Sequence, residues 1–250
     1  MRSLEEKLRK LKLHAMCDHL ERVLDDAARN NLSPVETIER LAEFEIEERF
    51  HRAVDRRFSQ SRLAARPGIE QFNFHHHKSR LQHKNAILSL LDLDFISSGT
   101  NVILIGNPGT GKTFLAQIIA TRACQKNHRV LFTTAMDMLN QLSASQVDRS
   151  LVRRLRFYTD PALIVCDELG YLALDQETSN LFYQVISGRY SARRSTIITT
   201  NTPFSEWGNI LYNTTIATAI ADRLVENSEI LLLGGDSLRK AKKSSHAKPA

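Results

Sequence analysis

Apolar residues recur at helical spacing over the first quarter of the chain. Their pattern predicts an amphipathic helix over residues 4–28. Ser33, Pro34 and Glu36 predict the start of a second helix, because serine caps a helix, proline suits its first position and glutamate completes a capping box. We therefore expect the chain to begin with a small all-helical domain.

The second predicted helix changes charge along its length. Residues 39–48 are acidic, whereas residues 49–66 are rich in arginine. An acidic start and a basic end suit the helix dipole, and the same arginines would suit a face that contacts phosphates. The sequence leaves both interpretations open.

A turn at Pro67 and Gly68 ends this helical region and is the predicted domain boundary. The three histidines at 75–77 have no cysteine or carboxylate partner at ligand spacing, so we interpret them as a solvated loop rather than a metal site. Residues 79–91 are predicted to form another helix.

From residue 101 the pattern changes to short apolar runs that alternate with helical segments. The runs and segments predict strands at 101–105, 129–134, 162–166, 195–200 and 229–233, and helices at 113–126, from about 135, at 179–190 and at 215–225. Apolar strands separated by helices are typical of a parallel sheet covered on both faces. The predicted fold class is therefore three-layer α/β with a central parallel sheet.

Composition narrows the class of protein further. Of the 250 residues, 42% are hydrophobic and 25% charged, the balance of a folded globular protein. The net charge of +6 and pI of about 9.3 favour polyanionic partners. No apolar run approaches the roughly 20 residues of a membrane-spanning helix, and the N-terminus lacks the apolar stretch of a secretory signal. Cys17, Cys124 and Cys166 fit no metal or disulfide spacing, so we expect buried free thiols in a cytoplasmic protein without membrane partners.

The segment Gly106–Thr113 reads Gly-Asn-Pro-Gly-Thr-Gly-Lys-Thr and lies between a predicted strand and a predicted helix. Glycines let the main chain wrap around phosphates with its N–H groups inward, and the helix start presents its positive end to the anion. Lys112 is expected to reach the β- and γ-phosphates, and the Thr113 hydroxyl to bind Mg²⁺. The predicted ATP-binding residues are Gly106, Asn107, Pro108, Gly109, Thr110, Gly111, Lys112, Thr113 and Phe114.

Polar residues stand at the ends of two further strands. Asp167 and Glu168 follow the third predicted strand, at the edge where parallel sheets bind ligands. We expect Asp167 to hold Mg²⁺ together with Thr113, and Glu168 to polarise the water that attacks ATP. Asn201 follows the fourth strand, and could orient that water or begin a turn before Pro203. We favour the first interpretation because three strand-end motifs coincide, and the sequence predicts a Mg²⁺-dependent ATPase.

These three elements resemble the AAA+ class of P-loop ATPases, with Asn201 as the sensor-1 residue. A closer resemblance, to the IstB family, rests on the segments Asp167–Leu172, Phe182–Tyr190, Thr199–Gly208 and Ala219–Leu224. IstB proteins are helper ATPases encoded beside the transposase in certain bacterial insertion sequences, and they are similar to the DnaC helicase loaders and, more distantly, to the initiator DnaA. The resemblance extends from the first helix to about Arg239.

The resemblance implies roles that residue spacing does not show. Residues 1–66 would bind double-stranded DNA and help subunits assemble, and residues 67–239 would form the ATPase domain. ATP would be bound between subunits of a homo-oligomer, with Arg223 as an arginine finger acting beside the catalytic Lys112, Glu168 and Asn201 of its neighbour. Arg239 would contact the nucleotide as a sensor-2-like residue.

Other interpretations stay open for two of the arginines. Arg223 could instead form a salt bridge with Asp222 or Glu226 on the helix surface. Arg189 is a further candidate for a contact between subunits.

Two smaller features complete the picture. Phe72 and Phe74 resemble the segment that packs near adenine in this family, or they cover an edge of the sheet. Residues 240–250 are lysine-rich, and we expect a disordered basic tail that adds attraction for phosphates or keeps the chain soluble.

Three functions compete. The leading one is an ATP-dependent DNA-binding helper that assembles on target DNA and recruits or stimulates its cognate transposase. The alternative is a replicative helicase loader of the DnaC type, whose N-terminal region would grip a helicase. A third, a small-molecule kinase, is disfavoured by the Asp-Glu pair, Asn201 and the segment around Arg223.

Overall fold

The computed structural model describes residues 2–170 and 173–237. The predictions for Arg239 and residues 240–250 therefore lie outside the described residues. The chain divides into two compact units, Met1–Arg56 and Arg57–Ala250, and the division falls within the helix α3 (Pro34–Ser61). The functional division into residues 1–66 and 67–239 stays a prediction.

The first unit contains α1 (Arg2–Lys10), α2 (His14–Asn30) and most of α3. The single helix predicted over residues 4–28 is wrong, because the chain breaks between α1 and α2, where Lys12 has a left-handed φ of 59°. Glu45 of α3 stabilises the new helix start, since its Oε2 accepts hydrogen bonds from the main-chain N–H groups of Ala15 (2.8 Å) and Met16 (3.3 Å). The apolar stripes meet in a small core of Leu8, Cys17, Leu20, Val23 and Leu41.

The predicted start of α3 is confirmed. The Ser33 N–H donates to Glu36 Oε2 (2.7 Å), and the Glu36 N–H donates to Ser33 Oγ (3.3 Å), which is a reciprocal capping box. The acidic and basic segments of α3 meet in the ion pairs Glu45–Arg49 (2.8 Å) and Glu48–Arg52 (2.7 Å), one helical turn apart.

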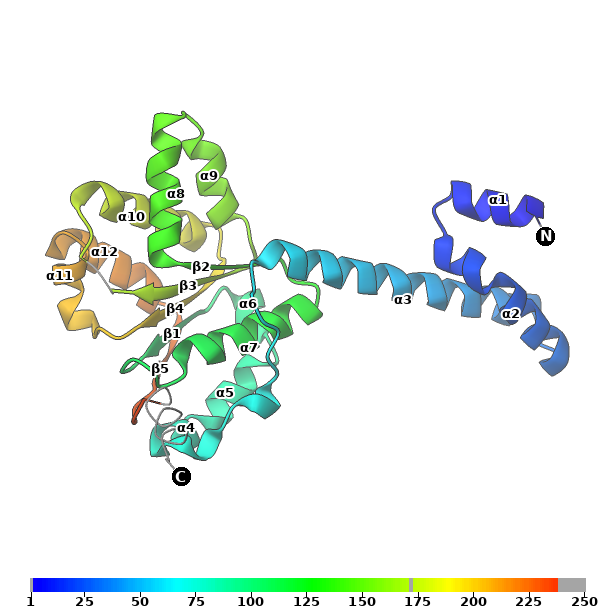
Figure 1. The fold of residues 1–250 in the computed structure, drawn as a ribbon, viewed down its shortest axis with the longest axis horizontal. Helices are drawn as coiled ribbons and strands as arrows, with labels where there is room; N and C mark the ends of the chain where they lie inside the picture. The colour runs from blue at the N-terminus through cyan, green and yellow to red at the C-terminus, as the bar shows by residue number, and fades with distance from the viewer. Residues whose placement is uncertain (1, 171–172, 238–250) are drawn as a thin grey trace, which may run out of the picture. The chain divides into compact units, whose positions relative to one another are not determined.

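The second unit is built on a five-stranded parallel sheet in the order β2-β3-β4-β1-β5 (Figure 1). Its strands are β1 (Asn101–Ile105), β2 (Val130–Thr134), β3 (Leu163–Leu169), β4 (Ser195–Thr200) and β5 (Ser228–Leu232). Because β4 lies between β1 and β3, the carboxyl ends of these three strands are neighbours. The predicted order along the chain is confirmed, and it brings the three strand-end motifs to one edge.

Helices cover both faces of this sheet, so the three-layer α/β prediction is confirmed (Figure 1). On one face lie α5 (Lys84–Leu90), α6 (Asp94–Ser98) and α7 (Lys112–Gln125), and on the other lie α8 (Ala135–Val147), α9 (Leu151–Thr159), α10 (Gln176–Ser191), α11 (Trp207–Ile210) and α12 (Thr214–Val225). One core cluster of this unit joins the sheet to α8, α10 and α12, and Trp207 and Tyr158 are fully buried in it.

Several element boundaries differ from the prediction. The helix predicted over residues 79–91 is two short helices, α4 (Lys78–Gln82) and α5, which meet at His83. His77 accepts a hydrogen bond from the Ser79 N–H and caps α4, and His76 bonds the Asp236 carbonyl. Helices α9 and α11 and the short 3-10 turns η1 (Ile69–Gln71), η2 (Phe74–His76) and η3 (Phe204–Glu206) were not predicted.

The three cysteines are buried and form no disulfide, which confirms the prediction of free thiols. Burial raises the pKa of Cys124 to about 11, and it raises the pKa of Cys166 further. None of the described helices is long and apolar enough to cross a lipid bilayer.

Candidate nucleotide-binding site

The phosphate loop Gly106–Thr113 connects the carboxyl end of β1 to the start of α7. Gly109 and Gly111 have left-handed φ angles of 84° and 90°, which residues with a Cβ rarely adopt. Gly106 has a different constraint, because a Cβ there would collide with the main-chain oxygen of Leu233, just after β5. The loop can therefore take this course only with glycine at these positions.

Lys112, the first residue of α7, folds back across this loop. Its Nζ donates to the main-chain oxygens of Gly106 (2.7 Å) and Asn107 (3.0 Å). These bonds hold the ammonium group within the curve of the loop, where a bound phosphate would need positive charge.

Arg80 supports the phosphate loop through hydrogen bonds that no sequence pattern predicts. Its side chain is 1% exposed, and its guanidinium donates to the main-chain oxygens of Thr110 (2.5 Å) and Asn73 (2.8 Å). The guanidinium also lies 4.5 Å from the ring centre of Phe72. Burial lowers the pKa of Arg80. Phe72 is thus a buried packing residue that holds Arg80, and its ring meets Phe74 edge-on at 5.1 Å.

Asp167 joins three elements at the edge of the sheet. Its carboxylate is buried, at 4% exposure, and Oδ1 accepts hydrogen bonds from the hydroxyls of Thr113 on α7 (2.9 Å) and Thr199 on β4 (2.5 Å). Hydroxyl and carboxylate oxygens are the ligands that Mg²⁺ prefers. Thr113 and Asp167 therefore fit the predicted metal-binding roles in residue type and in proximity.

Glu168 stands beside this pair on a strained piece of main chain. Its φ is 60°, and the strand pairing of β3 with β4 shifts register between Cys166 and Leu169. The Glu168 N–H donates to Thr199 Oγ1 (2.9 Å), and its side chain is exposed. Thr199 therefore bonds both acidic residues, a role that the sequence did not reveal.

These residues line a cavity of about 170 Å³ between the phosphate loop and the ends of β3 and β4. The cavity brings together most of the predicted site, and its lining residues are Pro108, Gly109, Lys112, Thr113, Glu168, Thr199, Thr200 and Asn201. Asn201 is exposed at its mouth, and its Oδ1 accepts only the weak hydrogen bond from Thr202 Oγ1 (3.3 Å) among the contacts described. Its amide is thus available to a ligand.

Arg223 lies at the other end of the sheet from this cavity. Main-chain oxygens of Arg223 and Leu224 accept hydrogen bonds from Asn101 Nδ2, at the amino end of β1, whereas the phosphate loop follows its carboxyl end. The guanidinium donates to the Ala219 oxygen (2.7 Å) and lies 4.9 Å from the ring centre of Tyr183. The described residues show no ion pair between Arg223 and Asp222 or Glu226, so the salt-bridge interpretation is wrong.

Arg189 is unavailable for a contact between subunits, so that prediction is wrong. Its side chain is 1% exposed, and its guanidinium donates to the main-chain oxygens of Tyr158, Thr159, Pro161, Ala162 and Ser195 and to the Thr196 hydroxyl. Burial lowers the pKa of Arg189, and the charge of Arg194 lowers it further. Arg189 is a structural clamp at the amino ends of β3 and β4.

A parallel sheet in this order, with a phosphate loop after β1, two acids at the carboxyl end of β3 and a polar residue after β4, defines a P-loop nucleotide-binding protein of the AAA+ class. Solved structures agree on the fold. The DnaC helicase loader superposes with a TM-score of 0.59 at 22% identity, over 66% of this chain and 96% of that one. AMPPCP-bound DnaA from Aquifex aeolicus gives a TM-score of 0.59 at 16% identity, over 76% of this chain and 58% of that one.

The chain belongs to the family of IstB-like ATP binding proteins, whose family model matches residues 6–246. A relative from Geobacillus stearothermophilus, named as the ATP-binding protein of insertion sequence IS5376, is 35% identical over 94% of this chain and 93% of its own length. Its counterpart of insertion sequence IS232 from Bacillus thuringiensis subsp. berliner is 34% identical over 92% of this chain and 90% of its own length. The expected resemblance is thus confirmed.

Proposed function

We propose that this protein hydrolyses ATP and, with ATP bound, assembles on duplex DNA to recruit or stimulate the transposase of an insertion sequence. The observation that carries the proposal is the Asp167 carboxylate, bonded by Thr113 and Thr199 beside the phosphate loop, with Glu168 next to it. A site that only holds a nucleotide needs the first acid alone. The second acid favours a hydrolytic site.

The polar residues in and next to the cavity have distinct tasks in this proposal. Lys112 and the N–H groups of the loop bind phosphate oxygens, and Thr113 and Asp167 would hold Mg²⁺, which neutralises charge on the phosphates. Glu168 accepts a hydrogen bond from the attacking water and polarises it. Asn201 orients the same water with its amide.

We assign Arg223 to a site shared between subunits of a homo-oligomer. Support comes from its position at the amino end of β1, which is the wrong end of the sheet for the phosphate loop of its own chain. A guanidinium supplied by a neighbour would stabilise charge on the phosphoryl group during transfer. ATP binding would then promote assembly, and hydrolysis would reset it.

The DNA and transposase partners are inferred from the family setting. Relatives named for insertion sequences match more than nine-tenths of this chain, and the chain is basic, with a pI of about 9.3. Both facts favour a cytoplasmic protein that works on DNA. In this proposal the helical residues 1–66 contribute to DNA binding and assembly.

Duplex DNA should be bound in the presence of ATP and should raise the rate of ATP hydrolysis. Binding should weaken by orders of magnitude between about 50 mM and 200 mM salt, because phosphate contacts release counterions. The Lys112→Ala variant should lose ATP binding and any effect that depends on it. No DNA binding at low salt with ATP present would overturn the proposal.

The shared site has its own test. Arg223→Ala and Lys112→Ala proteins should each be inactive alone, and mixing them should restore part of the ATPase activity, since some interfaces then pair an intact loop with an intact arginine. Failure of every mixing ratio to restore activity would contradict a role for Arg223 in the neighbour's site.

A further inference from the structure

A second cavity, of about 510 Å³, lies at the amino end of β2, whereas the nucleotide cavity lies at the carboxyl ends of the strands. We call it the arginine pocket. Its lining contains three arginines and no carboxylate, and consists of Arg57, Ser59, Gln60, Arg62, Arg129, Val130, Leu131, Phe157 and Pro161. All of these residues belong to the second unit.

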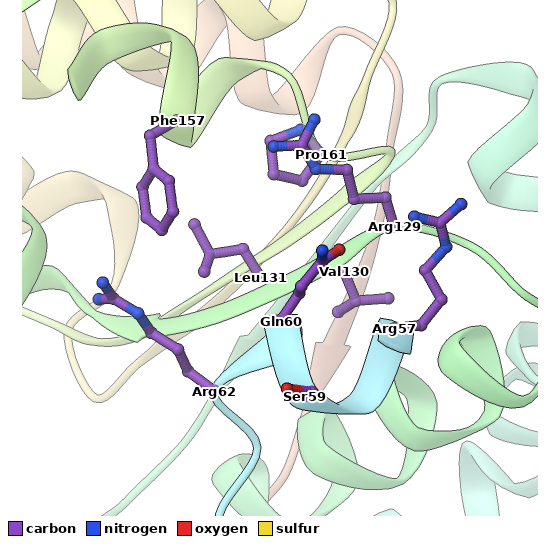
Figure 2. A pocket seen from close by; sticks show the side chains of 9 residues that line it. All are labelled: Arg57, Ser59, Gln60, Arg62, Arg129, Val130, Leu131, Phe157 and Pro161. Atoms are coloured by element: carbon purple, nitrogen blue, oxygen red, sulfur yellow. The ribbon is translucent and has the colours of Figure 1, made fainter. Parts of the chain in front are cut away.

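The three arginines that line the pocket come from two segments of the chain. Figure 2 shows Arg62 and Phe157 on one side, Arg57 and Arg129 on the other, and Leu131 with Val130 between them. Arg57 and Arg62 come from the end of α3 and the residue after it, and Arg129 directly precedes β2. The pocket thus has basic sides and an apolar floor.

Two of these side chains are held in place by neighbouring groups. Arg57 Nε donates to the main-chain oxygen (3.1 Å) and Oδ1 (3.0 Å) of Asn127, which leaves its terminal nitrogens for a ligand. The Arg62 guanidinium lies 5.0 Å from the ring centre of Phe157. A guanidinium stacked on a ring keeps its N–H edges free to donate.

No acid neutralises this charge in the described part of the chain, where none of the ion pairs involves Arg57, Arg62 or Arg129. Neighbouring groups respond to the positive field. Burial lowers the pKa of His128, and the charge of Arg57 lowers it further. The pocket therefore favours an anion.

The surroundings favour an extended anion over a small one. Helix α9, which supplies Phe157 to the pocket, carries three more arginines: Arg153 and Arg156 are exposed, and Arg154 lies 5.7 Å from the centre of the same Phe157 ring. Because two guanidinium groups already contact that ring, it is poorly placed to stack on a nucleobase. A phosphodiester backbone matches an arginine-rich surface without a free aromatic ring, because it is bound through its charge and not through its bases.

We propose that the arginine pocket binds the phosphodiester backbone of duplex DNA, so that the unit that holds ATP also grips DNA at the opposite end of its sheet. This inference rests on the proposed DNA binding and assigns it a site outside the N-terminal helices. Arg57, Arg62 and Arg129 all donate to phosphate oxygens in this proposal.

The test compares two double variants of the full chain. Arg62→Gln/Arg129→Gln removes two pocket charges, whereas Lys84→Gln/Arg122→Gln removes two exposed charges elsewhere in the same unit. With ATP present, the pocket variant should bind a duplex at least about tenfold more weakly than the control. Its plot of log affinity against log salt should be shallower by about 1.8, because each lost phosphate contact contributes about 0.9. A fluorescent ATP analogue should bind both variants equally.

The outcomes separate this inference from the proposed function. Wild-type protein that fails to bind DNA would overturn both. Wild-type protein that binds DNA, with a pocket variant indistinguishable from the control, would overturn the pocket assignment alone. If the pocket variant bound DNA normally but lost the transposase, the pocket would be a site for an acidic protein surface, and the DNA assignment would be wrong.

Discussion

The two ends of the parallel sheet carry opposite chemistry. At the carboxyl ends, oxygen atoms of Asp167, Thr113 and Thr199 gather beside a glycine-rich loop. At the amino ends, guanidinium groups gather, some exposed around a cavity and one, that of Arg189, fully buried. Parallel strands make this possible because every strand points the same way. The lesson is that one parallel sheet can present a nucleotide-binding edge at its carboxyl ends and a basic edge at its amino ends.

The largest expected effect lies at the carboxyl edge. Glu168→Gln keeps the shape of the side chain but removes the base, so ATP hydrolysis should fall by about 100-fold or more while ATP affinity stays within a few-fold of wild type. Hydrolysis and nucleotide binding are measured separately, with Lys112→Ala as the control that loses binding. A Glu168→Gln protein that hydrolyses ATP at the wild-type rate would show that Glu168 is not the base, and the carboxyl edge would then lack its proposed catalytic group.

The buried arginine of the amino edge should matter for stability. Arg189→Met leaves several buried carbonyls without a donor, so the free energy of unfolding should fall by about 3 kcal/mol or more. Arg153→Met, on the exposed face of α9, should change it by less than about 0.5 kcal/mol. Denaturant unfolding of both variants provides the measurement. Equal stability would mean that Arg189 is not the clamp that its hydrogen bonds indicate.

A smaller effect is expected at Thr199, which bonds both acidic residues. Thr199→Val removes the hydroxyl, so Asp167 loses a donor and the Glu168 N–H loses its acceptor, and hydrolysis should slow by about tenfold, the equivalent of one hydrogen bond of 1.4 kcal/mol. Thr199→Ser restores the hydroxyl and should restore the rate. If the serine variant were as slow as the valine variant, the methyl group rather than the hydrogen bonds would explain the defect.

The sequence predicted the features that depend on neighbouring residues. The phosphate loop, the capping box at Ser33 and the succession of strands and helices along the chain follow from local patterns of glycine, capping residues and apolar runs, and the structure has all three. The acids Asp167 and Glu168 near the carboxyl end of β3 were found in the same way. Each of these predictions needed only the types and spacing of residues close together in the sequence.

The features that the sequence missed depend on distant partners. The break at Lys12 follows from Glu45, which caps α2 from about 30 residues away. In the sequence Arg80 is an ordinary polar residue of a predicted helix. Its role depends on the main-chain oxygen of Thr110, about 30 residues away, which accepts its hydrogen bond. Arg189 looked like a surface cation because no pattern around it reveals the carbonyls that enclose it. Contacts between remote segments are the part of the fold that local patterns do not contain.

The close approach of Leu233 to Gly106 sets a limit on how this protein can vary. The obstacle to a side chain at position 106 is a main-chain oxygen, which no rotamer change can move aside. At Gly109 the neighbour is the Ser237 side chain, and the left-handed φ is a second barrier. In a library of all single substitutions, we therefore expect every replacement of Gly106, including alanine, to disrupt the nucleotide loop. The residue that the nucleotide loop can tolerate at position 106 is thus limited by Leu233, which follows β5 more than a hundred residues downstream.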